Sequence, residues 1–412
     1  MKSFELFILS ALMIFSTNRS YAQCNGRYET EIFSSVDITE IQYGVATQTD
    51  GSGTINLFMD VYEPTGDTAQ QRPVIIFAHG GSFIGGDKSS ADIVQLCNSF
   101  AKRGYVTVSI DYRLEQPLNM LNPDKMVKAL IRGVHDMKAS FRYFRMDEQT
   151  SNLFKVDINQ IFAGGVSAGA IIAAHVAYMD SSDQIASNYL TFIDQLGGFE
   201  GESGNPDFSS AVSGVISMAG ALADASWLGA WNQPIISFHS INDGTVPYGN
   251  GHAYNYSFMP VLHGSLMIDS RADTIDTYSV LYSYPGSGHP HFMSGTNIDQ
   301  AIMDSTILLT SDFMYSILAC NPNNVVDVEE LQSENYFLIY PNPADEFIKI
   351  EFPFLNSSTG INIFNSFGQL MRTQNYSPGL SITFDIGSLA KGIYFLEISN
   401  QNVTQHQILL VQ

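Results

Sequence analysis

The sequence predicts an α/β fold with a mostly parallel central sheet and helices on both faces, followed by a small all-β sandwich domain. Near-continuous apolar runs at 73–78 and 105–110 are typical of strands buried on both faces of a parallel sheet. They alternate with stretches of helical spacing at about 90–103 and 126–145, as in α/β domains. After residue 335 the pattern changes to short alternating segments separated by turns, which indicates a β-sandwich.

The composition limits which class of protein this chain can be and which partners it can bind. The chain has 412 residues, of which 45% are hydrophobic and 12% aromatic. This supports one large core and a smaller second one, and excludes a disordered or collagen-like class. The formal net charge of −22 argues against nucleic acid and anionic membranes as partners, because phosphate groups would be repelled.

Residues 1–22 are typical of a secretory signal peptide. Lys2 supplies the positive start, Leu6–Phe15 an apolar run, and Ser20-Tyr21-Ala22 a cleavage site with small residues. The apolar run is too short to span a membrane. The residue before Cys24 fits a lipoprotein signal poorly, so no lipid anchor is expected. The mature protein is therefore predicted to be exported and soluble, either secreted or at the cell surface.

Export permits disulfide bonds, and the chain has three cysteines. Cys97 shares the expected buried face of a helix with Leu96 and Phe100, which favours an inert core thiol. This leaves Cys24 and Cys320 as the expected pair. None of the three cysteines has the spacing of a metal ligand.

The apolar run at 73–78 ends in His79-Gly80-Gly81-Ser82. A glycine-rich turn at the end of a strand can aim consecutive backbone N–H groups at an oxyanion. A plain glycine loop is the alternative. His79 is expected to brace this loop rather than to act as a base. Ahead of this run, an alternating pattern over Ile38–Pro64 with a central turn predicts a β-hairpin.

The segment Gly165-Val166-Ser167-Ala168-Gly169 has the pattern of a nucleophile elbow. The apolar run Ile161–Gly164 precedes it and the Ala- and Ile-rich run Ala170–Tyr178 follows it, giving the strand, turn and helix that such an elbow needs. Its two outer glycines let the strand and the helix approach closely. Ser167 is therefore the candidate nucleophile, and the N–H of Ala168 is a candidate oxyanion donor.

A candidate acid follows the expected strand at 234–239. Asp243 lies in the loop after that strand, where it could orient and stabilise the imidazolium of a histidine base. The alternative interpretation of Asp243 is a turn-forming residue before a glycine. Asp224, after the preceding strand, is the second candidate for the acid.

His289 is the candidate general base. It follows Gly286-Ser287-Gly288, in the loop after the expected strand at 278–284, and it completes the order Ser, Asp, His. We prefer it to His291. The two histidines could also suggest a metal site, but no carboxylate or cysteine stands near them at ligand spacing.

Residues 180–210 combine a short helical pattern with a tail rich in Gly, Ser and Pro. This segment forms either a modest cap over the site or an elaborate connection, and the sequence leaves both possibilities open. A helix over about 299–318 is expected to end the domain.

The stretch of about 38–320 resembles the α/β-hydrolase superfamily, and within it the carboxylesterases with an HGGG-type oxyanion loop. The matching segments are His79-Gly80-Gly81-Ser82-Phe83, Asp111-Tyr112-Arg113-Leu114, Asp157 and the elbow. The resemblance implies that the backbones of Gly81, Ser82 and Ala168 form the oxyanion hole. The chain departs from the family at Ser82, where a third glycine is usual. The acid segment Asn242–Pro247 looks more like that of dienelactone hydrolases and prolyl-oligopeptidase-type enzymes.

The C-terminal part resembles the sorting domain of the type IX secretion system. The similarity is carried by Tyr340-Pro341-Asn342-Pro343, Phe364–Gly368 and Gly392-Ile393-Tyr394. It implies passage through an outer membrane, followed by release or surface attachment. A carbohydrate-binding sandwich is the alternative. The predicted division is a signal peptide at 1–22, a catalytic domain at 23–320, a linker at 321–335 and a sorting domain at 336–412.

The sequence thus favours an exported serine carboxylesterase with the triad Ser167, Asp243 and His289. It would form an acyl-enzyme on short-acyl esters or acylated glycans, with no cofactor or metal. Its expected partners are an ester substrate and the secretion machinery, and its oligomeric state is open. The alternatives are a polyester or lipid hydrolase, a peptidase of the prolyl-oligopeptidase type, and a non-catalytic surface-binding protein.

Overall fold

The computed structural model describes the larger domain almost completely. Described are residues 26–229, 232–294, 297–318 and 338–411, the last range with gaps at 341, 352–358, 366–368, 377–380 and 400–403. The predicted signal peptide, the predicted Cys24–Cys320 pair and the predicted linker lie outside these residues. Among the described residues, no helix combines the length and the apolar character that a membrane span requires.

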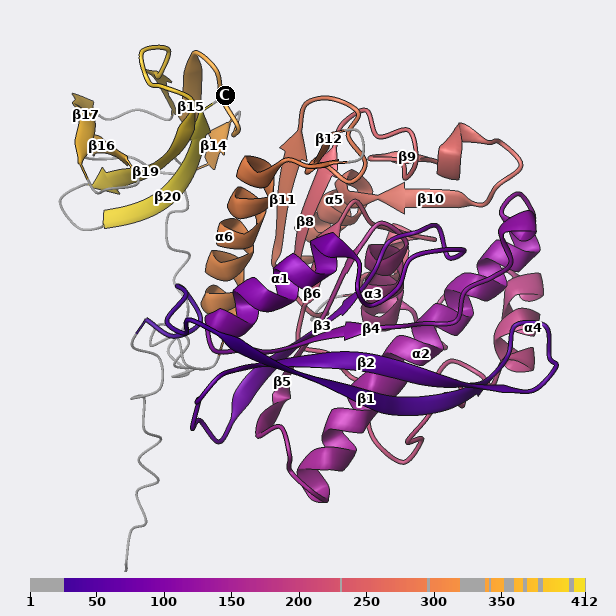
Figure 1. The fold of residues 1–412 in the computed structure, drawn as a ribbon. Helices are drawn as coiled ribbons and strands as arrows, with labels where there is room; N and C mark the ends of the chain where they lie inside the picture. Colours follow the sequence, from indigo (N-terminus) through magenta and orange to yellow (C-terminus); the bar gives the residue numbers. More distant parts are fainter. Residues whose placement is uncertain are drawn as a thin grey trace, which may run out of the picture.

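The larger domain is built on one eight-stranded sheet in the order β1-β2-β4-β3-β5-β6-β8-β11 (Figure 1). The first two strands form the predicted hairpin and β2 runs antiparallel to β4, whereas every later pair is parallel. The strands are β1 Val36–Thr47, β2 Thr54–Pro64, β3 Arg72–Ala78, β4 Val106–Ile110, β5 Val156–Val166, β6 Val215–Met218, β8 Ile235–Ser240 and β11 Ser279–Tyr284.

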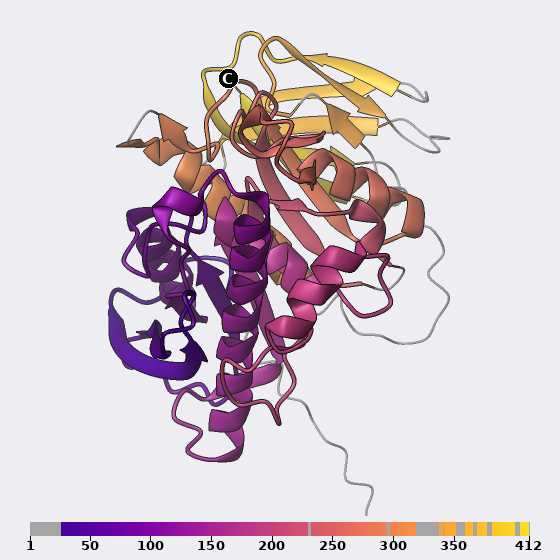
Figure 2. The same cartoon turned by 90° about the vertical axis from the view of Figure 1, so that its right-hand side faces the viewer.

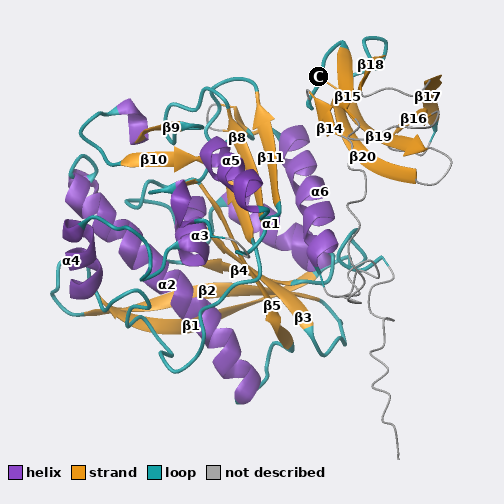
Figure 3. Ribbon diagram, turned by 180° about the vertical axis from the view of Figure 1, so that it is seen from behind, coloured by secondary structure: helices purple, strands orange, loops and turns teal. Residues whose placement is uncertain are grey.

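Helices cover both faces of this sheet, which confirms the predicted α/β class (Figure 3). Successive residues of β3 alternate between two cores: Val74 and Ile76 pack with α2, α3 and α5, and Ile75 and Phe77 pack with α1 and α6. The helices are α1 Ala91–Lys102, α2 Pro123–Gln149, α3 Ala168–Tyr178, α4 Ser187–Gln195, α5 Ser265–Ile275 and α6 Gln300–Ile317. Cys97 is a free, fully buried thiol in the second core, as predicted, and its burial raises its pKa.

The structure corrects and extends the predicted elements. Strand β6 has only four residues and begins at Val215. A second sheet, of three short strands, was not predicted: β7 Ala221–Leu222, β10 Val261–Gly264 and β9 Asn250–His252. Strands of two to four residues are too short to show a hydrophobic period, and α5 after them is too polar to show one. Helix α4 lies beside α2 in both Figure 1 and Figure 2.

The C-terminal domain has two small antiparallel sheets, in the orders β14-β15-β18 and β17-β16-β19-β20. Buried side chains from both sheets, such as Ile350, Ile363 and Leu396, share one core. This confirms the predicted β-sandwich. The strands are β14 Leu338–Tyr340, β15 Phe347–Glu351, β16 Thr359–Asn365, β17 Leu370–Tyr376, β18 Ser381–Asp385, β19 Gly392–Ser399 and β20 Thr404–Val411.

Two glycines allow α3 to pack directly on the end of the main sheet. A Cβ atom at Gly169 would lie 2.0 Å from the carbonyl oxygen of Ala78, at the end of β3. A Cβ atom at Gly165 would lie 2.2 Å from the carbonyl carbon of Gly169. Because both obstacles are backbone atoms, neither can move aside like a flexible side chain. The turn between β5 and α3 therefore requires glycine at both ends.

We expect Gly169→Ala to lower the free energy of unfolding by at least about 2 kcal/mol, because the added methyl group forces α3 away from β3. Chemical denaturation measures this loss. Gly249→Ala is the matched control, since a Cβ atom there would meet no atom within 4 Å and that residue's φ is not positive. Equal stability of the two variants would contradict the packing argument.

Candidate active site

Ser167 occupies a strained turn between β5 and α3. Its φ of 54° and ψ of −117° lie in a region that non-glycine residues rarely adopt. Hydrogen bonds fix the turn on both sides: Ser167 N–H donates to the Met218 carbonyl at 2.8 Å, and Ile171 N–H donates to the Ser167 carbonyl at 3.0 Å. The turn thus holds the hydroxyl at the carboxyl edge of the main sheet, beside the N-terminus of α3.

A chain of two hydrogen bonds joins the three predicted triad residues. The Ser167 Oγ lies 2.7 Å from His289 Nε2, and His289 Nδ1 lies 2.5 Å from Asp243 Oδ2. The three residues follow three different parallel strands, β5, β8 and β11, whose carboxyl ends meet at one edge of the sheet. This is the geometry of a nucleophile, a base and an orienting acid.

Asp243 is buried, and protein groups donate hydrogen bonds to its carboxylate. Its Oδ1 accepts hydrogen bonds from the N–H groups of Thr245 at 2.8 Å and Val246 at 3.1 Å. Burial by itself would raise the pKa of Asp243. Hydrogen bonds from His239 and His289, the charge of His289 and the Thr245 amide outweigh burial, so the pKa lies well below its usual range. The carboxylate therefore stays ionised.

His239 is a neighbour of Asp243 that the sequence analysis did not identify. Its Nε2 lies 3.4 Å from Asp243 Oδ2 and 3.2 Å from the Val246 carbonyl, and its Nδ1 lies 2.8 Å from Ser265 Oγ. The side chain is fully buried. A histidine within a buried strand, four residues before the acid, was the available signal. His239 thus contacts the Asp243 carboxylate in addition to His289.

The glycine-rich loop after β3 lies against the nucleophile. A Cβ atom at Gly80 would be 3.5 Å from Ser167 Cβ. The loop turns back on itself, because Ile84 N–H and Gly85 N–H both donate to the Gly81 carbonyl at 3.0 Å. Within the described part of the chain, the backbone N–H groups of Gly81, Ser82 and Ala168 have no hydrogen-bond acceptor. All three predicted oxyanion donors are therefore unused.

Ser82 and Tyr254 connect this loop to the acid segment. Ser82 has a φ of 57°, which is unusual for a non-glycine residue, and its Oγ is hydrogen-bonded to the hydroxyl of Tyr254. Tyr254 N–H donates to the Thr245 carbonyl at 2.9 Å. The hydroxyl at the position where the related loops have glycine is thus bound by a tyrosine that sequence analysis missed.

The remaining candidate residues lie away from the triad. Asp224, the alternative acid, caps a short 3-10 turn, and its Oδ1 lies 3.7 Å from His263 Nδ1. It is therefore not the partner of His289. His291 is buried, with Nε2 2.8 Å from Thr306 Oγ1. His79 stacks on Tyr112, and its Nδ1 lies 2.6 Å from the Gly80 carbonyl, so it braces the loop as predicted. The described residues contain no group of three or more His, Cys, Asp or Glu side chains placed to hold a metal ion.

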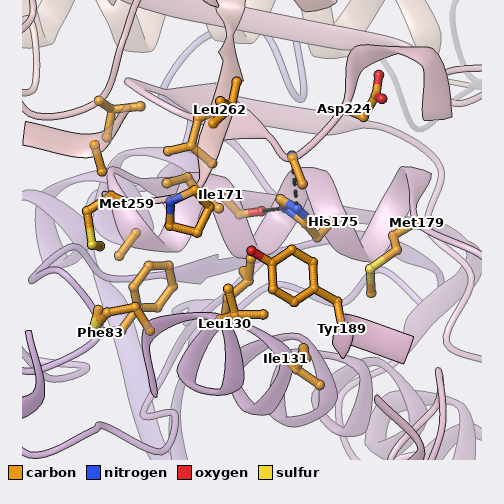
Figure 4. Close-up of a pocket in the computed structure, with 18 of the residues that line it drawn as sticks. Phe83, Leu130, Ile131, Ile171, His175, Met179, Tyr189, Asp224, Met259 and Leu262 are labelled. Carbon is orange, nitrogen blue, oxygen red and sulfur yellow. Dashed lines mark hydrogen bonds between the residues drawn. The ribbon is translucent and has the colours of Figure 1, made fainter. Parts of the chain in front are cut away.

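A cavity of about 340 Å³ opens beside Ser167 (Figure 4). Residues of α2 and α3 form part of its wall, and Gln184–Ala186, Tyr189 and Ile193 form another part. Of the segment 180–210, residues 184–193 therefore form one side of the cavity, and residues 194–210 do not line it. The segment 253–262 forms a further side that the sequence analysis did not predict.

The depressed pKa of Asp243 makes a prediction about acid stability. Its ionised form stabilises the folded state above its unfolded pKa of about 3.9, and this contribution is lost as the pH falls below that value. We expect wild type to exceed Asp243→Asn in unfolding free energy by about 2 kcal/mol at pH 7. The difference should shrink when denaturation is repeated between pH 4 and pH 2. A difference that stays constant over this range would contradict the assigned pKa.

Comparison with known proteins is consistent with this architecture. Residues 59–224 match the family model BD-FAE, and residues 338–412 match the secretion system C-terminal sorting domain. No curated protein matches the chain significantly.

Similar solved structures include esterase 2 of Thermogutta terrifontis. Its paraoxon-phosphorylated and propionate-bound forms are each 20% identical to this chain, cover 68% of it and 94% of their own length, and have a TM-score of 0.48. The butyrate-bound form is 19% identical, with the same coverage and a TM-score of 0.47.

The sorting domain indicates transport by the type IX system to the cell surface or the medium. The chain thus joins a carboxylesterase domain of the α/β-hydrolase type, in which residues 59–224 match BD-FAE, to a C-terminal secretion sorting domain at residues 338–412.

Proposed function

We propose that this esterase works through a covalent acyl-enzyme formed on Ser167. The observation that carries the proposal is the continuous hydrogen-bonded chain from Ser167 Oγ through His289 to Asp243, with distances of 2.7 Å and 2.5 Å. Three loops that are distant in sequence contribute to it. Such an arrangement suits proton transfer from a hydroxyl nucleophile.

In the first half-reaction, His289 Nε2 accepts the proton of Ser167 as Oγ attacks the ester carbonyl. The negative charge that forms on the carbonyl oxygen is stabilised by the N–H groups of Gly81, Ser82 and Ala168 and by the N-terminus of α3. Asp243 remains ionised and stabilises the imidazolium. His289 then donates the proton to the departing alcohol oxygen.

In the second half-reaction, His289 removes a proton from water, which attacks the acyl group on Ser167. Collapse of the second tetrahedral intermediate breaks the bond from the acyl carbon to Ser167 Oγ, which receives the proton back from His289, and releases the carboxylic acid. None of these steps calls for a cofactor or a metal ion. Because the sorting domain directs the chain outward, we propose acyl esters of extracellular glycans as its natural substrates.

Replacing the nucleophile tests the proposal. We expect Ser167→Ala to lower kcat/KM on 4-nitrophenyl esters by at least about 10³-fold while the denaturation midpoint stays close to wild type. Ser209→Ala, which removes an exposed hydroxyl, is the control and should keep full activity. Activity that survives in Ser167→Ala would refute the assignment. Glycans that carry acetyl or longer acyl esters then extend the test to the proposed substrates.

The bond between Ser82 and Tyr254 generates a second prediction. Removing the hydroxyl in Tyr254→Phe releases Ser82 from its unusual backbone conformation, so we expect kcat to fall about 10-fold. Glycine adopts that conformation without strain, so Ser82→Gly should make the loop independent of Tyr254.

The double variant provides the control. Adding Tyr254→Phe to Ser82→Gly should cost little more activity, which makes the two substitutions strongly non-additive. Simple multiplication of the two losses in kcat would show that Tyr254 acts on something other than Ser82.

A further inference from the structure

The cavity beside Ser167 has an almost entirely apolar lining. Most of its wall comes from α2, α3, the segment containing α4, and the segment 253–262, which runs into β10. The loop after β3, residues 223–227 and the loop after β8 complete the lining. In Figure 4, Leu130, Ile171 and Leu262 surround the same space from three of these parts. The further apolar lining residues include Met126, Val127, Ile131, Met179, Ile193 and Met259.

Most polar residues of the lining are hydrogen-bonded or lie at the rim, whereas Trp227 Nε1 is buried with no hydrogen-bond partner among the described residues. His175 is buried, and its Nδ1 donates to the Ile171 carbonyl at 2.8 Å while its Nε2 accepts from Ala223 N–H at 3.2 Å. Burial also lowers the pKa of His175 to about 4, so the ring stays neutral. Gln184 is exposed and Asp224 half-buried, which places them next to solvent. The interior therefore offers little to a sugar hydroxyl or a charged group.

The position of the cavity indicates which half of an ester enters it. Ser167, Ala168 and Ser82 line the cavity, but His289 does not. His289 must protonate the departing alcohol oxygen, so the alcohol lies on the histidine side of the reacting carbon. The acyl group, on the other side of that carbon, points into the cavity.

The size of the cavity favours acyl groups longer than acetyl. A methyl group takes roughly the space of one water molecule, about 30 Å³, so acetate would leave most of the 340 Å³ unfilled. A chain of about six to ten carbons would fill most of it. Each methylene transferred from water into an apolar site contributes about 0.8 kcal/mol, or nearly 4-fold in kcat/KM.

We propose that this cavity is an acyl pocket and that the enzyme prefers esters of medium-length, unbranched aliphatic acids to acetates. This inference rests on the proposed function, because it uses Ser167 and His289 to orient the substrate. The proposal concerns only the acyl group of the substrate. The alcohol group lies on the side of His289, outside this cavity, and can be large.

Two constitutional isomers test the orientation. Ethyl hexanoate and hexyl acetate contain the same atoms, but the long chain lies on the acyl side of the first and on the alcohol side of the second. We expect kcat/KM to be at least 10-fold higher for ethyl hexanoate. A preference for hexyl acetate would mean that the cavity binds the alcohol, and would overturn the proposal.

Filling the pocket tests its location. Leu130→Trp should lower kcat/KM for 4-nitrophenyl octanoate at least 10-fold and leave hydrolysis of 4-nitrophenyl acetate within about 3-fold of wild type. Leu262→Trp, on the opposite wall, serves as a second variant if the first does not fold. Gln149→Trp, at the exposed end of α2, is the matched control and should keep the wild-type profile.

The possible failures are distinguishable. A wild-type enzyme that hydrolyses acetate and octanoate equally, with activity still dependent on Ser167, would overturn the acyl pocket alone. Equal loss on both esters in the two pocket variants would do the same. Loss of dependence on Ser167 would instead refute the catalytic proposal.

Discussion

The close contact between α3 and the ends of β3 and β5 is the constraint on which the site depends. Gly165 and Gly169 let backbone meet backbone there, and the chain between them can only turn sharply. This turn places Ser167 in a strained backbone conformation, and among the described residues the N–H of Ala168, the first of α3, has no acceptor. The strained backbone of Ser167 and the unbonded N–H of Ala168 both follow from this packing.

The electrostatics of the site follow from what surrounds Asp243. A buried carboxylate would normally be protonated more easily, but two amides and two histidines hold its charge. An ionised partner fixes the orientation of the His289 ring, so that its Nε2 faces Ser167 Oγ. His239 extends this support to Ser265 at the start of α5. The acid loop is thus anchored to the scaffold rather than free at the surface.

The sequence predicted the parts of this molecule that have a strong local signal. The apolar runs of β3 and β4, the glycines around Ser167 and the order of Ser167, Asp243 and His289 all depend on nearby residues or simple chain order. The structure brings those three side chains together, and their catalytic role stays a proposal. The sandwich after residue 335 was predicted for the same reason, since its strands alternate clearly.

Contacts between distant segments could not be predicted in the same way. His239 and Tyr254 carry no motif, and each matters only because folding places it against Asp243 or Ser82. Only residues 180–210 were considered from the sequence as a cover for the site. The pocket instead takes its walls from α2 and from the loop before β10, as well as from α4. Its depth is a property of packing among elements rather than of any one segment.

The most direct test of the central claim is to locate the covalent bond. An alkylphosphonate 4-nitrophenyl ester, which mimics the tetrahedral intermediate, should release one equivalent of nitrophenol and abolish esterase activity. Mass spectrometry of the digested protein should then find the phosphonyl group on the peptide that contains Ser167, in stoichiometric amount. A label on another residue, or full esterase activity in protein labelled at Ser167, would contradict the account.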